Sequence, residues 1–82
     1  MDLDYKNVLA RITGIILTVL KKDIALAENT EFQADIGMTS LQVMELIFEI
    51  EESFDISFPL NRLPAISNIK DLAEVVLAIL EQ

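Results

Sequence analysis

The chain is short, acidic and rich in apolar residues. Its 82 residues suffice for one small domain with a single hydrophobic core, and 52% of them are hydrophobic. Acidic residues outnumber basic ones by 14 to 6, and the resulting net charge of -8 excludes a protein that binds the phosphate backbone of nucleic acids. The absence of cysteine and histidine excludes disulfides, thiolate chemistry and the usual general base and metal ligand. We therefore expect a single domain over residues 1–82 that is stabilised by helix packing.

The first predicted element is an amphipathic helix over residues 4–20. Its apolar residues recur at helical spacing, at Val8, Ile12, Ile15, Ile16 and Val19. Gly14 costs this helix about 1 kcal/mol relative to alanine, from which we expect close packing at that position. The apolar run is too short to span a membrane, and Asp2 and Asp4 do not suit the basic start of a signal peptide. These features predict a cytoplasmic protein.

A long connection and a second helix follow. Residues 23–38 show no sustained periodicity, and a connection of this length in a compact domain is often functional. Residues 40–53 contain strong helix formers and lack glycine and proline, so they predict a helix. Thr39 suits the N-cap, which makes Ser40 the first helical residue. The Ser40 hydroxyl is then exposed near the positive end of the helix dipole, where a phosphate ester would be well placed.

The rest of the chain predicts one short and one long helix. Residues 60–66 follow Pro59 and include Pro64, so they form at most a short helical turn. Ser67 or Asn68 can cap a last helix over residues 69–81. Its inward positions are Ile69, Leu72, Ala73, Val76 and Leu80. The expected fold is all-α, an antiparallel bundle of three long helices plus one short helix, with a long loop between helices one and two.

The helix over residues 40–53 has more than one apolar face. At about 100° per residue, one arc faces the core and consists of Val43, Leu46, Ile47, Ile50 and Phe54. The opposite arc holds Gln42 and three acids that repel one another. We expect these acids and the apolar residues outside the core arc to form a partner-binding surface. Its residues are Leu41, Met44, Glu45, Phe48, Glu49 and Glu52. Two alternatives are a merely solvated acidic face and, for Phe48, packing under the long loop.

Two segments carry a resemblance to a known family. They are Asp-Ile-Gly-Met-Thr-Ser-Leu at residues 35–41 and Glu-Glu-Ser-Phe-Asp-Ile-Ser-Phe-Pro at residues 51–59, and they resemble acyl carrier proteins. The similarity extends over residues 32–80. It implies 4′-phosphopantetheine, transferred from coenzyme A to Ser40 by a phosphopantetheinyl transferase. The flanking motif is Asp35, Gly37, Thr39 and Leu41, in which Asp35 is a contact for that enzyme or its magnesium and Thr39 replaces the aspartate most common in the family.

The resemblance implies a carrier and not an enzyme. It holds acyl thioesters on its prosthetic arm and presents them to loading and transferring enzymes in fatty acid, lipid or polyketide-type biosynthesis. In many family members the acyl chain is shielded between the helices, and the candidate residues for such a pocket are Val43, Ile47, Ile66 and Leu72, which otherwise form a filled core. The acidic charge favours a monomer, and no metal site is expected.

Two alternatives to an acyl carrier remain open in the sequence. One is an aminoacyl or peptidyl carrier, and the other is a helical interaction module that is never modified. Residues 60–65 contain Arg62 and no acid, whereas members that serve primary fatty acid synthesis usually have an acidic short helix there. This difference argues against assuming the standard partner set, so a specialised carrier loaded by a dedicated enzyme is as good an interpretation as the housekeeping one.

Overall fold

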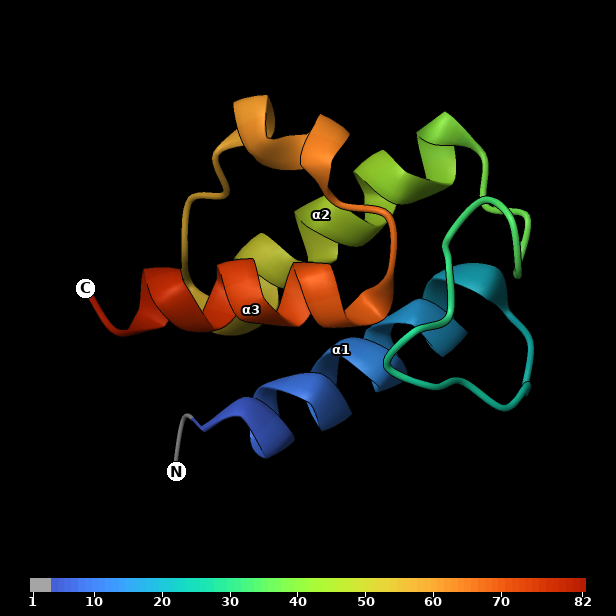
Figure 1. Ribbon diagram of the computed structural model, residues 1–82, viewed down its shortest axis with the longest axis horizontal. Coiled ribbons are helices and arrows are strands. Elements are labelled where there is room, and N and C mark those ends of the chain that lie inside the picture. Colours follow the sequence, from blue (N-terminus) through green and yellow to red (C-terminus); the bar gives the residue numbers. More distant parts are fainter. Residues whose placement is uncertain (1–3) are drawn as a thin grey trace.

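The computed structural model describes residues 4–82, and its helices lie where the sequence predicts them. Helix α1 spans Tyr5–Leu20, α2 spans Ser40–Phe54, the 3-10 helix η1 spans Leu60–Ala65, and α3 spans Ile69–Leu80. Helix α1 runs opposite to α2 and α3 and packs against both, while η1 lies on the side of α2 and α3 away from α1 (Figure 1). The predicted bundle of three long helices and one short helix is confirmed. No helix within residues 4–82 combines the length and apolar character needed to cross a membrane.

Each α-helix begins at a polar side chain that caps it. Asp4, Thr39 and Asn68 each accept a hydrogen bond from the backbone amide three residues further on. In α2 and α3 the third helical residue also accepts a bond from the amide of the cap, which completes a capping box. Asp4 is therefore the cap of α1 and not its first residue, and Asn68, not Ser67, caps α3. The predicted ends differ by one residue, since α2 includes Phe54 and α3 stops at Leu80.

The core forms where the apolar faces of the three α-helices meet. Its buried residues are Val8, Ile12 and Ile16 from α1, Leu46, Ile47, Ile50 and Phe54 from α2, Ile69, Leu72, Ala73 and Val76 from α3, and Phe32, Met38 and Phe58 from the connections. Val43 and Leu80, which the periodicity assigns to the core, are only half-buried. The exposed side of Val43 faces a cavity that is described below.

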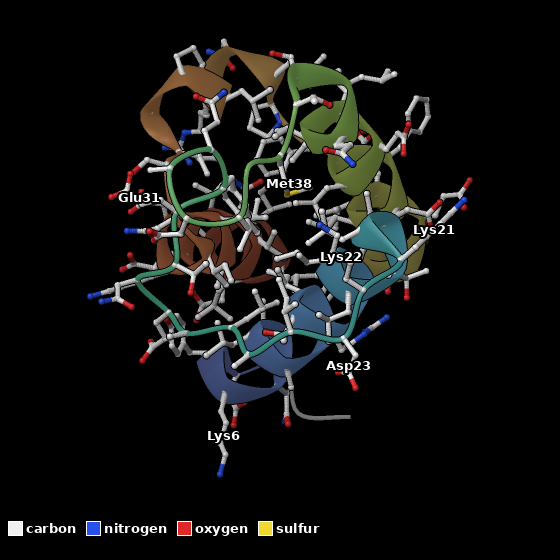
Figure 2. All side chains as sticks on the ribbon, turned by 90° about the vertical axis from the view of Figure 1, so that its right-hand side faces the viewer. Lys6, Lys21, Lys22, Asp23, Glu31 and Met38 are labelled. Atoms are coloured by element: carbon white, nitrogen blue, oxygen red, sulfur yellow. The ribbon has the colours of Figure 1, made fainter. Side chains whose placement is uncertain are left out.

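The connection between α1 and α2 is part of the packed structure. Phe32 and Met38 are both buried, and Figure 2 shows the Met38 sulfur turned into the interior while Lys6 points away from the protein. The Phe32 amide donates to the Ser67 carbonyl at 3.0 Å, and the Met38 amide donates to the Phe32 carbonyl at 2.7 Å. Burial and backbone hydrogen bonds therefore hold the loop beside the start of α3.

The same loop satisfies backbone groups at the start of α3. The carbonyls of Thr30 and Glu28 accept hydrogen bonds from the amides of Ile69 and Lys70, at 3.2 and 2.8 Å. These two amides belong to the first turn of α3, which has no acceptors of its own within the helix. The Tyr5 hydroxyl of α1 donates to the Glu28 carboxylate. One loop residue thus connects α1 with α3.

Gly14 does not mark a close contact, so the expectation of tight packing there is wrong. Gly14 is exposed in the middle of α1, and a Cβ atom built on it would have no neighbour within 4 Å. The surface of α1 is open at this point because the glycine leaves space that no other element fills.

Candidate functional site

Ser40 is the first residue of α2, as the sequence predicts. Thr39 has extended backbone angles, and its side-chain oxygen accepts a hydrogen bond from the Gln42 amide at 3.1 Å. The Gln42 side chain accepts a bond from the Thr39 amide at 3.0 Å in return. Because Thr39 serves as the cap, the exposed Ser40 hydroxyl is not needed for that role. It lies at the positive end of the helix dipole, which favours a negatively charged substituent.

The loop before Ser40 owes its shape to Gly37 and Asp35. Gly37 has a φ of 62°, in the left-handed region that other residues adopt only with strain, and its amide donates to the Gln33 carbonyl at 3.1 Å. A carboxylate oxygen of Asp35 accepts a hydrogen bond from the Glu31 amide at 2.8 Å. Both flanking residues therefore stabilise the turn that leads into α2. The function of Asp35 as a contact for a modifying enzyme stays a prediction.

A cavity of about 350 Å³ lies beside Ser40, between α2, η1 and the start of α3. Ser40 itself lines the cavity, together with the four predicted pocket residues Val43, Ile47, Ile66 and Leu72. The other lining residues are Phe32, Gln33, Met44, Leu46, Leu63, Pro64 and Ser67. Its volume lies in the range of roughly 300–1,000 Å³ that is typical of small-molecule sites. The fold thus gathers the predicted residues around one space that reaches the serine, although their role as an acyl pocket stays a prediction.

Several lining residues were not predicted from the sequence. Phe32 comes from the loop, and Leu63 and Pro64 come from η1, where no helical periodicity indicates which side chains face inward. The one available signal for Phe32 was a large aromatic residue in a polar stretch, since such residues are seldom left in solvent. The polar lining residues Gln33 and Ser67 carried no comparable signal.

The predicted partner-binding residues lie on the surface of α2. Leu41 and Phe48 are 69% and 67% exposed, and Met44 is 37% exposed. The alternative in which Phe48 packs under the long loop is therefore wrong. The acids of this set, Glu45, Glu49 and Glu52, are exposed as well. We call these six residues the α2 surface; that it binds partners stays a prediction.

Comparisons with known proteins agree with this arrangement. A family model described as the phosphopantetheine attachment site matches residues 10–76. The acyl carrier protein of Clostridium acetobutylicum is 31% identical over 77 residues, which cover 94% of this chain and 92% of that protein. The solution structure of the holo acyl carrier protein from Geobacter metallireducens has a TM-score of 0.80 and 32% sequence identity, and the match covers 90% of this chain and 86% of that one.

The chain is also similar to a small part of a much larger protein. Over 71 residues it is 34% identical to the non-reducing polyketide synthase dbaI of Emericella nidulans, a match that covers 87% of this chain and 2% of the synthase. The family model spans most of the chain, and the Clostridium protein is matched over nearly its whole length. The chain therefore belongs to the acyl carrier protein family, whose members bear covalently bound 4′-phosphopantetheine.

Proposed function

We propose that Ser40 bears the 4′-phosphopantetheine and that the protein presents acyl groups to enzymes of fatty acid, lipid or polyketide-type biosynthesis. The observation that supports this most strongly is the position of Ser40, which has an exposed hydroxyl at the first position of α2 and also lines the cavity. On modification, the Ser40 oxygen forms a bond to a phosphorus of coenzyme A. Adenosine bisphosphate leaves, and the hydroxyl proton passes to the phosphopantetheinyl transferase.

The residues around Ser40 suit a phosphorylated arm. The start of α2 stabilises the added negative charge, and Thr39 keeps the helix capped without using the Ser40 hydroxyl. Gln33 and Ser67 place polar groups at the cavity, where amides of the arm can bind. The protein is a carrier and not an enzyme, because the attached arm supplies the thiol that holds the acyl group while partner enzymes supply the catalysis.

The apolar part of the cavity supports an acyl cargo. Val43, Ile47, Ile66 and Leu72 surround it with hydrocarbon, and each methylene of a chain that is buried there contributes about 0.8 kcal/mol. An aminoacyl cargo brings a charged amine that this lining would not solvate. Comparing the loading of the holo protein by a fatty acyl ligase and by an aminoacyl ligase distinguishes the two cargoes.

The α2 surface supports binding to basic partner enzymes. Its exposed apolar residues Leu41, Met44 and Phe48 lie beside exposed acids on the same helix, close to the modification site. An apolar centre with a charged rim is the usual anatomy of a transient interface. The proposal also includes a cytoplasmic protein with one carrier domain over residues 1–82. Its net charge of -8 favours a monomer.

Intact mass spectrometry tests the attachment site. The protein is incubated with coenzyme A, magnesium and a broad-specificity phosphopantetheinyl transferase, alongside the variants Ser40→Ala and Ser57→Ala. Ser57 is another exposed serine and serves as the matched control. We expect one phosphopantetheine addition on the wild type and on Ser57→Ala, and none on Ser40→Ala. A folded wild-type protein that gains no mass would contradict the proposal and favour an unmodified helical interaction module.

A further inference from the structure

A hollow between α1 and α2 is separate from the cavity at Ser40. Its volume is about 230 Å³, and its lining residues are Arg11, Gly14, Ile15 and Thr18 of α1 and Glu49 and Ser53 of α2. This volume is below the roughly 300–1,000 Å³ of small-molecule sites and suits a single side chain. Gly14 contributes to the hollow because it has no side chain, and a Cβ atom there would meet nothing within 4 Å.

We propose that this hollow is a second docking point for the partner enzymes and that it receives a lysine or arginine side chain beside Glu49. The inference rests on the proposed carrier function, since it is the carrier that has partner enzymes. Glu49 is exposed, belongs to the α2 surface and also lines the hollow, so the two regions are continuous. The net charge of -8 favours a basic occupant.

The two ends of the hollow differ in charge. At one end Arg11 donates hydrogen bonds to the carbonyl and the hydroxyl oxygens of Ser53, at 2.5 and 2.6 Å, and its guanidinium carbon lies 4.2 Å from the centre of the Phe54 ring. These contacts hold the positive charge of Arg11 at the end of α2. Glu49 precedes Ser53 by four residues and so lies about one helical turn closer to Ser40 along α2. Its carboxylate attracts an incoming cation to that end of the hollow.

The wall formed by α1 suits the hydrocarbon stem of a basic side chain. Gly14 and the apolar residue Ile15 line the hollow, and the Thr18 hydroxyl donates to the Gly14 carbonyl at 3.1 Å, so this hydroxyl is already paired within the helix. Lysine and arginine pack their stems on such apolar surface while the charged end meets a carboxylate. Glu49 is the carboxylate that lines this hollow.

Filling the hollow tests the proposal, with Gly14→Leu as the variant and Ala10→Leu as the matched control. Ala10 is an exposed residue one turn earlier in α1 and does not line the hollow. Two reactions are measured: modification of the apo protein by the transferase, and acylation of the holo protein by a fatty acyl ligase. We expect Gly14→Leu to lower kcat/KM in at least one of them by about fivefold or more, the effect of a contact worth about 1 kcal/mol. Its melting temperature should not fall, since leucine is a better helix former than glycine.

A third variant, Glu49→Gln, identifies the charge of the occupant. We expect it to lower kcat/KM in the same reaction and to reduce the dependence of that rate on salt. If Gly14→Leu matches Ala10→Leu in both reactions, the docking point is ruled out. If Gly14→Leu is slow but Glu49→Gln behaves as the wild type, a basic occupant is ruled out. A wild-type protein that is not modified at all overturns the carrier function and this inference with it.

Discussion

Two adjacent hydroxyl residues have different tasks at the start of α2. The Thr39 oxygen accepts a bond from the Gln42 amide, whereas Ser40 is exposed and lines the cavity. If a single serine did both, modification of its oxygen would remove the cap from the helix. Separating the tasks leaves the Ser40 hydroxyl available for the proposed modification while Thr39 keeps the helix start capped.

Tyr5 in α1 makes a hydrogen bond that reaches beyond its own helix. Its hydroxyl donates to the Glu28 carboxylate, and the Glu28 carbonyl accepts a hydrogen bond from the Lys70 amide at 2.8 Å. The hydrogen bond to Glu28 raises the pKa of Tyr5 from 10.0 to about 12, with smaller effects from burial and from the charges of Glu28 and Glu74. A raised pKa means that the folded state holds this proton more tightly than the unfolded chain.

The titration of Tyr5 gives a direct test of this contact. The stability that comes from its raised pKa is present below pH 10 and is lost as the pH rises toward about 12. Tyr5 is the one tyrosine in the chain, so the ultraviolet absorbance of tyrosinate reports on it alone. We expect a midpoint near pH 12 in the folded wild type and a lower midpoint in Glu28→Gln. Equal midpoints in the two proteins would show that Glu28 does not hold the hydroxyl.

Helix α2 contributes to the core, begins at Ser40, the proposed modification site, and forms the α2 surface. One side buries Leu46, Ile47 and Ile50, and its first turn presents Ser40. The remaining side exposes the α2 surface described above. The capping box at Thr39 therefore matters for the proposed function, because fraying of the first turn would displace Ser40.

Removing this cap tests its contribution to the helix. We expect Thr39→Ala to lower the free energy of unfolding by about 1 kcal/mol, because the Gln42 amide loses its acceptor. For a domain of this size that loss corresponds to a drop of about 4–8 °C in the melting temperature. Ser40→Ala is the matched control, and a thermal scan should show little change for it. A larger loss in Ser40→Ala than in Thr39→Ala would mean that Ser40 is the true cap.

The cavity beside Ser40 is a property of the whole molecule. It needs the first half of α2, η1, the start of α3 and Phe32 from the loop. Phe32 is held there by the backbone hydrogen bond from its amide to the Ser67 carbonyl, while η1 has no buried residue and no side-chain cap. The cavity wall formed by η1 is therefore held in place by fewer contacts than the wall formed by the loop.

An attached acyl chain should stabilise the whole protein by filling this cavity. Each buried methylene contributes about 0.8 kcal/mol, so an octanoyl thioester should melt several degrees above the holo form. The variant Val43→Phe places a larger side chain in the cavity and should lose most of this gain. Differential scanning calorimetry of the holo and octanoyl forms of both proteins makes the comparison. Equal melting temperatures for the two wild-type forms would contradict burial of the chain.

Much of the fold and the position of Ser40 could be predicted because they depend on nearby residues. The helical periodicity of the apolar residues and the caps at Thr39 and Asn68 act within a few positions of the chain. The position of Gly37 in a turn follows in the same way, since a left-handed residue favours glycine. The helix boundaries were accordingly correct to within one residue.

The cavities between elements could not be predicted from the sequence, because they depend on how segments distant in the chain pack together. Periodicity assigned both Val43 and Ile47 to the inner side of α2, and both line the cavity, yet Ile47 is buried while Val43 is only half-buried. Gly14 was expected to be tightly packed and instead lines an open hollow. The sequence by itself determined the helices, their caps and the serine at the start of α2, because those signals are local. Only the tertiary structure decided where cavities remain, because an apolar face must be buried but its spacing does not determine how completely its neighbours fill the space.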